Sequence, residues 1–240
     1  MEATGTDVHE GIEPFDQVKL TPVIKANIEL AHYTSPTPVQ KHSIPVILAK
    51  RDLMSCAQTG SGKTAAFLVP ILNRIFEDGP AAPSSGSGYG RRKLCPLALV
   101  LAPTRELATQ IQEEADKFGR AAGYLSACAY GGAGKREQLA AMRSASVLVA
   151  TPGRLEDLVN TNELSLSQCR FFVLDEADGL LKAGYEPLIN RLHEAVPKVT
   201  SDGRRLQMIV CSATLHAMEV RKLADRLMYF PTWVDLKGQD

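Results

Sequence analysis

The sequence predicts an α/β fold in which helices cover both faces of a doubly wound, mostly parallel sheet. Short, continuously apolar runs recur along the chain, and such runs are typical of strands buried on both faces of a parallel sheet. Between them lie stretches with apolar residues at three- and four-residue spacing, as in amphipathic helices. This alternation indicates a doubly wound sheet, in which ligands bind at the carboxyl ends of the strands.

In chain order, the apolar runs predict strands over Asp52–Cys56, Leu97–Ala102, Leu125–Ala129, Ser146–Ala150, Phe171–Leu174 and Gln207–Cys211. The helical spacing predicts helices over Lys63–Glu77, Thr104–Phe118, Gly134–Met142, Pro187–Val196 and His216–Met228. Strand and helix alternate on both sides of the Gly- and Ser-rich segment Gly79–Gly90, which therefore predicts a loop within one domain. The basic residues after it, Arg91, Arg92 and Lys93, are either a phosphate contact or the solvated end of the loop.

Composition is that of a globular protein, with 45% hydrophobic and 22% charged residues. No apolar run approaches the ~18 residues of a membrane span, and the polar start of the chain does not resemble a signal peptide. We therefore expect an intracellular protein, cytoplasmic or nuclear, without membrane contact. The 27 basic residues equal the 27 acidic ones, which argues against a dedicated basic clamp but allows a local basic face. The five scattered cysteines form no C-x-x-C pair, as expected of reduced thiols.

A phosphate-binding loop is predicted between the first strand and the first helix. The segment reads AQTGSGKT and fits G-x-x-x-x-G-K-[ST], with the first position relaxed to Ala57. Gly60 and Gly62 allow backbone amides to turn toward phosphates, Lys63 places a positive charge on the outer ones, and Thr64 offers a hydroxyl to Mg²⁺. The alternative is a chance glycine turn before a helix. The predicted nucleotide-binding residues of this loop are Ala57, Gln58, Thr59, Gly60, Ser61, Gly62, Lys63 and Thr64.

An acidic motif follows the apolar run that ends at Leu174. Asp175–Asp178 reads DEAD, and an acid at the end of an apolar strand is the position that holds hydrated Mg²⁺ opposite a phosphate loop. Asp175 is therefore a candidate metal ligand through water, and Glu176 is placed to orient or deprotonate an attacking water. The alternative is a solvated first turn of a helix, where acids are common.

At this point the sequence resembles the DEAD-box ATP-dependent RNA helicases over roughly Phe15 to Trp233. The resemblance rests on an ordered set of motifs: PTPVQ at 36–40, AQTGSGKT at 57–64, PTRELA at 103–108, GG at 131–132, TPGR at 151–154, DEAD at 175–178 and SAT at 212–214. It implies a RecA-like P-loop NTPase domain over residues 15–240, after an extension over 1–14. The implied cofactors are ATP and Mg²⁺, and the implied partners are RNA and a second RecA-like domain.

The resemblance also implies residue roles. Gln40 would read the adenine edge and Tyr33 would stack on the adenine ring, although Tyr33 is equally a candidate helix-end core aromatic. The implied nucleotide contacts upstream of the loop are Phe15, Tyr33, Thr34, Pro38 and Gln40. The implied RNA-backbone contacts are Pro103, Thr104, Arg105, Gly132, Thr151, Pro152, Gly153 and Arg154. Thr104 is also a candidate N-cap and Gly153 a candidate turn residue. Ser212 and Thr214 would link the acidic motif to RNA binding, or cap a helix.

Two departures accompany the resemblance. The chain up to about Arg154 is similar to the Vasa and Ded1-like branch, whereas residues 175–196 and 210–238 are similar to the branch that carries a SPRY insertion. A mixed or engineered sequence and an uncommon subfamily are the open alternatives. Gly179 stands where most of the family has a basic residue, and Leu215 where an aromatic follows SAT. No run resembles the HRxGRxxR-type motif of the second motor domain.

We therefore expect the ATP-binding half of an RNA helicase, nearly inactive and monomeric when isolated. The rival functions are a nucleotide-dependent RNA clamp that hydrolyses little ATP, and a P-loop phosphotransferase such as a small-molecule kinase. ATP turnover by a two-domain protein would distinguish a helicase from the clamp. Stimulation of ATP hydrolysis by RNA would distinguish a helicase from the phosphotransferase.

Overall fold

The computed structural model describes residues 2–5, 19–58, 60–79, 93–119, 126–132 and 134–236. The predicted site residues Phe15 and Thr59 lie outside these ranges, as do Arg91, Arg92 and all but the first residue of the predicted loop Gly79–Gly90. Among the described residues, no helix is both long and apolar enough to cross a membrane.

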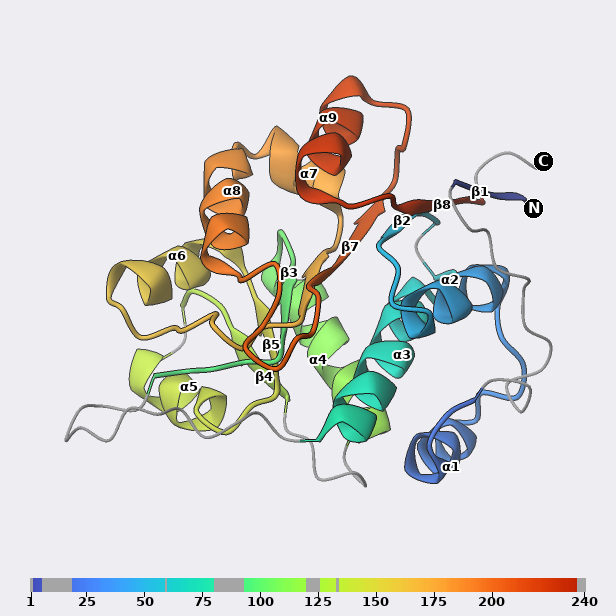
Figure 1. Ribbon diagram of the computed structural model, residues 1–240. Helices are drawn as coiled ribbons and strands as arrows, with labels where there is room; N and C mark the ends of the chain where they lie inside the picture. Colours follow the sequence, from blue (N-terminus) through green and yellow to red (C-terminus); the bar gives the residue numbers. More distant parts are fainter. Residues whose placement is uncertain are drawn as a thin grey trace.

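The described strands form one sheet in the order β1-β8-β2-β7-β6-β3-β5-β4 (Figure 1). Neighbouring strands are parallel throughout, except that β1 pairs antiparallel with β8. The mostly parallel sheet is thus confirmed, together with all the predicted strands. Their bounds are β1 Glu2–Gly5, β2 Leu53–Cys56, β3 Ala98–Leu101, β4 Ser126–Ala129, β5 Val147–Ala150, β6 Phe171–Leu174, β7 Gln207–Ser212 and β8 Thr232–Asp235.

The strands that the sequence did not predict lie at one edge of the sheet. In β8, buried and half-buried residues alternate, in contrast to the continuous burial of β2, β3, β5, β6 and β7. A four-residue alternation gives a much weaker signal than a continuous apolar run. The segment Glu2–Gly5 contains no apolar run at all.

The predicted helices are confirmed within a few residues at each end, and the described part of the chain contains four more. The bounds are α1 Pro22–Leu30, α2 Pro38–Leu48, α3 Lys63–Asp78, α4 Arg105–Gly119, α5 Lys135–Met142, α6 Pro152–Asn160, α7 Ala177–Lys182, α8 Glu186–Ala195 and α9 Met218–Leu227. The helices that were not predicted are α1, α2, α6 and α7. Three of these begin with proline, which suits a first helical turn because it has no N–H to leave unsatisfied. A second proline, Pro45, stands inside α2 and masks its helical pattern.

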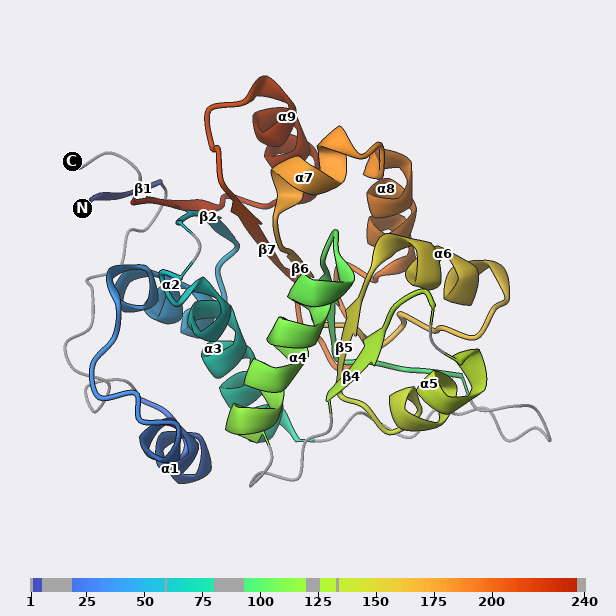
Figure 2. The ribbon, with the colours of Figure 1, turned by 180° about the vertical axis from the view of Figure 1, so that it is seen from behind.

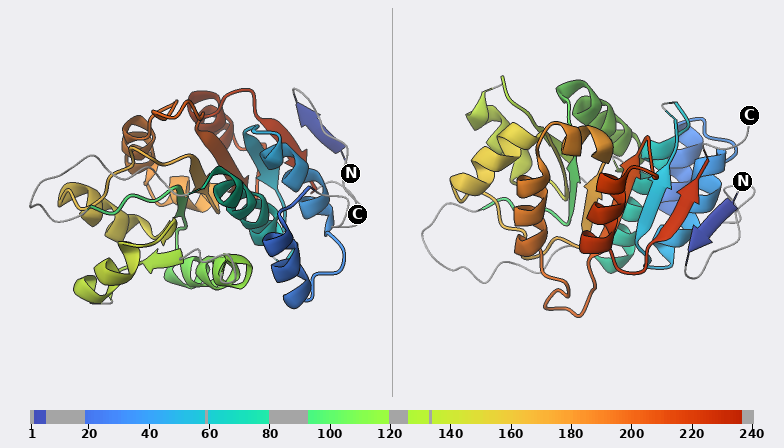
Figure 3. Two further views of the ribbon diagram at one scale, coloured as in Figure 1. Left: turned by 60° about the horizontal axis from the view of Figure 1, so that its bottom comes forward. Right: turned by 90° about the horizontal axis from the view of Figure 1, so that it is seen from above.

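Helices cover both faces of the sheet (Figures 1 and 2). On one face, α2, α3 and α4 pack against the sheet through buried residues such as Phe67 and Ile111, and α1 packs against α3 and α4. On the other, α6 to α9 pack through residues such as Leu155 and Leu223, as the view from above also shows (Figure 3). Within β6, Val173 belongs to the first cluster and Phe172 to the second, as the alternation of side chains along a strand requires. Burial on both faces explains why these strands read as continuous apolar runs.

The strand order brings the predicted motifs together at one edge of the sheet. The carboxyl ends of β2, β7 and β6 are neighbours, so the phosphate loop, the SAT motif and the DEAD motif lie in a row. The carboxyl ends of β3, β5 and β4 continue that row, and the segments that follow them carry the predicted RNA contacts. The sheet therefore places the predicted nucleotide contacts and the predicted RNA-backbone contacts side by side.

All five cysteines are free, as predicted. Cys56, Cys169 and Cys211 are buried, whereas Cys95 and Cys128 are partly exposed.

Candidate functional site: a phosphate loop beside a row of polar strand ends

The phosphate loop runs from the end of β2 at Cys56 to the start of α3 at Lys63. Gly60 and Gly62 have φ angles of +80° and +82°, in the left-handed region that favours glycine. A Cβ atom on Gly62 would also lie 2.5 Å from Nε2 of Gln40. A larger residue at position 62 would thus strain the backbone and push away the side chain that holds the loop.

Gln40 connects α2 to the phosphate loop. Its Oε1 accepts a hydrogen bond from the backbone N–H of Thr37 at 3.0 Å, which caps α2, and its Nε2 donates to the carbonyl of Gly62 at 3.1 Å. The side chain is fully buried. In this structure both ends of the amide that was predicted to read adenine are therefore bonded to backbone groups.

Lys63 and Asp175 form an ion pair at the centre of the site. The Nζ of Lys63 lies 3.2 Å from Oδ1 of Asp175, and the two side chains are 15% and 0% exposed. Burial alone lowers the pKa of Lys63, but nearby negative charge, chiefly that of Asp175, together with the hydrogen bond to Asp175 outweighs burial and raises that pKa above its ordinary value. Lys63 is consequently positively charged where phosphate would bind.

The second oxygen of Asp175 is the feature that fits a metal. Oδ1 also accepts the backbone N–H of Glu176 at 2.9 Å, whereas Oδ2 is buried and has no hydrogen-bond partner among the described residues. A buried carboxylate oxygen without a partner is costly unless a ligand or water satisfies it. Hydrated Mg²⁺ suits such an oxygen, because Mg²⁺ in phosphate sites keeps several waters and prefers carboxylates.

Glu176 has a left-handed backbone, with φ 48° and ψ 51°, at the N-cap of α7. A non-glycine residue in this region costs on the order of 1–3 kcal/mol, and such strain clusters at functional sites. Its side chain reaches a pocket of about 560 Å³, which is within the usual size of small-molecule sites. The pocket is lined by Ala57, Gln58, Lys63, Glu176, Asp178, Gly179 and Ala213.

The SAT motif is hydrogen-bonded to the DEAD motif and to the residue that precedes the phosphate loop. The backbone N–H of Ala213 donates to Oδ1 of Asp178 at 3.4 Å, and the Cys56 thiol donates to the carbonyl of Ala213 at 3.4 Å. The hydroxyl of Ser212 donates to the carbonyl of Thr214 and accepts its N–H, at 3.0 and 3.3 Å. Ser212 therefore shapes the turn, and a change at the DEAD motif can reach the end of β7 through Asp178.

Arg105, at the start of α4, comes together with Tyr130 and Gly132 in the segment that follows β4. The guanidinium carbon of Arg105 lies 4.3 Å from the ring centroid of Tyr130, and a Cβ on Gly132 would be 3.9 Å from Nη1 of Arg105. The sequence predicted Arg105 and Gly132 but missed Tyr130. The available signal was an aromatic placed directly between an apolar strand and the Gly131–Gly132 pair. Stacking on Tyr130 orients the Arg105 guanidinium at an exposed position.

The other predicted RNA contacts lie at helix starts. Thr104 accepts the backbone N–H of Leu107 at 3.3 Å, so its alternative role as an N-cap is confirmed. Thr151 precedes α6 and its N–H donates to the carbonyl of Ala129 at 2.9 Å, while Pro152 is the first helical residue. Gly153 lies within the first turn of α6, so its alternative interpretation as a turn residue is wrong; the Pro at the helix start hid this element. Arg154 follows, half-buried, in the same helical turn.

Pro103 lies between the motifs of the nucleotide site and the predicted RNA contacts. A Cβ on Gly179 would be 3.8 Å from Cγ of Pro103, which places the segment after β3 against the start of α7. Gly179, one of the departures from the family pattern, therefore lines the pocket and lies beside Pro103, a predicted RNA contact.

Tyr33 is not brought to the phosphate loop with Gln40. Its hydroxyl donates to Oε2 of Glu114 at 3.1 Å, and its ring packs at 5.6 Å against Phe118, both on α4. Burial, followed by the charge of Glu114, raises the pKa of Tyr33 to about 12. These contacts are those of the helix-end core aromatic named as the alternative. Of its predicted companions, Thr34 is exposed and Pro38 is the first residue of α2.

This fold and site define a P-loop NTPase domain of the α/β class. A sequence profile of the family described as DEAD/DEAH box helicase matches residues 37–223. The chain belongs to the DEAD/DEAH box helicase family, and its fold is the RecA-like domain that the motifs predicted.

Solved structures agree with this assignment. The chain resembles a DEAD box protein from the hyperthermophile Methanococcus jannaschii, with a TM-score of 0.79 and 28% identity over 95% of this chain and 57% of that one. It also resembles the yeast DEAD-box splicing factor Prp28, with a TM-score of 0.85 and 30% identity over 98% of this chain and 54% of that one. The chain spans about half the length of these proteins.

Proposed function

We propose that this chain is the ATP-binding half of an RNA-dependent ATPase that binds the RNA backbone and couples ATP hydrolysis to local duplex unwinding. The observation that carries the proposal is the arrangement of Lys63, Asp175 and Glu176 around one pocket, with the orphaned Asp175 Oδ2 facing no protein donor among the described residues.

Each of these side chains has a distinct task. Lys63 binds the outer phosphate oxygens, and Asp175 accepts hydrogen bonds from the waters of Mg²⁺ through Oδ2. When bound, Mg²⁺ neutralises charge on the phosphates. Glu176, held in its left-handed conformation, orients the attacking water and takes its proton. Gln40 holds Gly62 so that the loop amides stay aimed at the phosphates.

RNA binding is proposed for the adjacent row of strand ends. Arg105 offers a guanidinium oriented by Tyr130, and the loops after β4 and β5 offer backbone amides and the Thr151 hydroxyl. Such groups contact phosphate and ribose and carry little base information, so binding is expected to be mostly independent of sequence.

A steady-state ATPase assay tests this function. It compares this chain with the same chain joined to a second motor domain, each with and without single-stranded RNA. No arginine lines the pocket in the described part of the chain, and an arginine finger typically supplies ~10³–10⁵ in rate. We expect the isolated chain to bind ADP, to hydrolyse ATP barely and not to unwind, whereas the joined protein shows RNA-stimulated turnover.

Three results would contradict the proposal in different ways. RNA-stimulated turnover by the isolated chain at the rate of the joined protein would show that no second domain is needed. ATP-dependent retention of RNA by the joined protein without turnover would identify a clamp. Turnover that RNA leaves unchanged would favour a phosphotransferase.

A further inference from the structure

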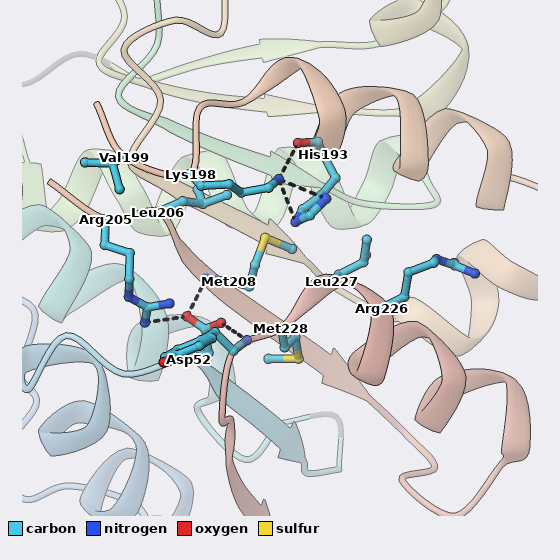
Figure 4. Close-up of a pocket in the computed structure, with 11 residues that line it drawn as sticks. Asp52, His193, Lys198, Val199, Arg205, Leu206, Met208, Arg226, Leu227 and Met228 are labelled. Carbon is cyan, nitrogen blue, oxygen red and sulfur yellow. Dashed lines mark hydrogen bonds and ion pairs between the residues drawn. The ribbon is translucent and has the colours of Figure 1, made fainter. Parts of the chain in front are cut away.

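A second pocket lies at the opposite end of the sheet from the nucleotide site. It has a volume of about 300 Å³ and lies beside Asp52 and Met208, at the amino ends of β2 and β7 (Figure 4). The phosphate loop and the SAT motif follow the carboxyl ends of these same two strands. A ligand in this pocket therefore leaves the nucleotide and RNA contacts free.

The floor of the pocket is apolar and contains two methionines. It is formed by Leu206, Met208, Leu227 and Met228, and Figure 4 shows Met208 between the Lys198–His193 pair and the Asp52–Arg205 pair. Methionine side chains are unbranched and adapt to different partners, which makes them common at protein-binding surfaces.

Exposed apolar side chains gather at the mouth of this pocket. Val199 and Tyr229 line it and are 58% and 61% exposed, and the ring of Phe230 packs edge-on against Tyr229 at 4.7 Å. Among the described residues, the other large apolar side chains with such exposure are Leu30 and Met218, which are not part of this group. Phe230 also has a φ of +42°, an outlier for a bulky residue and a conformation typical of sites under functional constraint.

One positive charge at the mouth has no carboxylate partner. Arg205 pairs with Asp52 at 3.2 Å and Arg226 with Glu186 at 2.7 Å. The Nζ of Lys198 instead donates to the carbonyl of His193 at 2.8 Å and lies 3.1 Å from both ring nitrogens of that residue. The charge of Glu194 acts on Lys198 from beyond ion-pair distance, and no carboxylate in the described ranges lies within that distance, so the mouth can accept one negative charge.

We propose that this pocket docks a partner protein through a short segment in which a carboxylate stands next to a large apolar side chain. The apolar side chain enters between Met208, Leu227 and Met228, and the carboxylate binds Lys198. The exposed edge formed by Val199, Tyr229 and Phe230 extends the contact beyond the pocket, as a polypeptide requires. RNA fits less well, because a single unpaired cation supplies few phosphate contacts and the floor offers methionine and leucine in place of a stacking ring.

The test uses a random 12-residue peptide library displayed on phage and selected against the full 240-residue chain. Selected peptides are synthesised, and their affinities are measured for four variants that unfold at the wild-type temperature. Lys198→Glu and Val199→Asp alter the mouth of the pocket. Lys222→Glu and Leu30→Ser change an exposed lysine and an exposed leucine elsewhere and serve as matched controls.

We expect selected peptides that pair Asp or Glu with a large apolar residue. Binding of these peptides should shift the methyl signals of Met208 and Met228. Their affinity for both pocket variants should fall at least about tenfold, because like charges across an interface repel. Their affinity for both control variants and for the ADP-loaded protein should be unchanged. Selection of no such peptide, equal binding by Lys198→Glu, or a shift of the same methyl signals by a ten-nucleotide uridine RNA in place of peptide would overturn the proposal.

Discussion

Two buried aspartates stand at opposite ends of the sheet, Asp52 before the amino end of β2 and Asp175 after the carboxyl end of β6, and their surroundings differ in one respect. Asp52 is 1% exposed and accepts hydrogen bonds from three donors: the backbone N–H of Met208 at 3.1 Å, the backbone N–H of Tyr229 at 2.8 Å and the guanidinium of Arg205 at 3.2 Å. Asp175 is equally buried, but its Oδ2 has no partner among the described residues. The fully hydrogen-bonded carboxylate of Asp52 stabilises the fold, whereas the partnerless Oδ2 of Asp175 is available to bind a ligand.

The largest expected effect belongs to the residue beside Asp175. Glu176→Gln in the two-domain protein retains size and hydrogen bonding but removes the base. ATP turnover should fall about 10²-fold or more, as for removal of a general base, while ATP binding survives. Stopped-flow binding and steady-state turnover measure the two quantities separately. Lost ATP binding would instead make Glu176 a metal ligand or a structural residue, and Lys63→Ala, which should weaken nucleotide binding first, is the comparison.

The comparison of the two aspartates is itself testable with the same substitution at each. In Asp52→Asn the amide NH₂ must face one of the donors, so unfolding free energy should fall by about 1–3 kcal/mol, the cost of an unsatisfied buried group. In Asp175→Asn the NH₂ can take the place of the partnerless Oδ2, and Lys63 is partly exposed, so stability should fall less while Mg²⁺-dependent ADP binding is lost.

Urea unfolding of both variants, with and without MgADP, measures this difference. A greater loss of stability in Asp175→Asn than in Asp52→Asn would reverse the assigned roles.

Substitutions of Gln40 can separate its hydrogen bond that caps α2 from its hydrogen bond to the phosphate loop. Gln40→Glu keeps an acceptor for the Thr37 N–H but removes the donor to Gly62 O, whereas Gln40→Ala removes both. We expect Gln40→Ala to lose the preference for ADP over GDP, a discrimination of ~1–3 kcal/mol, and to weaken α2. Gln40→Glu should retain helix stability and lose nucleotide affinity. Unchanged ADP and GDP affinities in Gln40→Ala, measured by titration calorimetry, would exclude the adenine role.

The smallest expected effect concerns His193 at the second pocket. Burial, followed by the charge of Lys198, lowers the pKa of His193 below its ordinary value of 6.5. The unfolded chain therefore binds the proton more readily than the folded one, and the stability associated with neutral His193 is present above pH 6.5 and is lost as pH falls below it. The difference in unfolding free energy between wild type and His193→Gln should therefore shrink as the pH falls below 6.5. A constant difference between pH 7.5 and 5 would contradict this assignment.

Local patterns predicted the strands that are buried on both faces and the helices with a regular apolar stripe. They failed for α2, where Pro45 interrupts the stripe, and for β8, where only Trp233 and Val234 are apolar. Tyr130 was missed because its partner, Arg105, is 25 positions earlier, and their contact depends on the adjacent ends of β3, β5 and β4. Tyr33 and Gln40 were predicted as a pair, yet α1 and α2 place them against different elements.

The sequence by itself determined the α/β class, the order of the motifs and the chemistry of the phosphate loop and the DEAD segment. These depend on residue types at short spacing, which fix backbone conformation and charge locally. Only the tertiary structure decided that Gln40 holds Gly62, that Asp178 reaches Ala213, and that Asp52 binds Met208 across 156 positions. Such contacts depend on strand order in the sheet, because parallel neighbours are joined by long crossovers that no local pattern specifies.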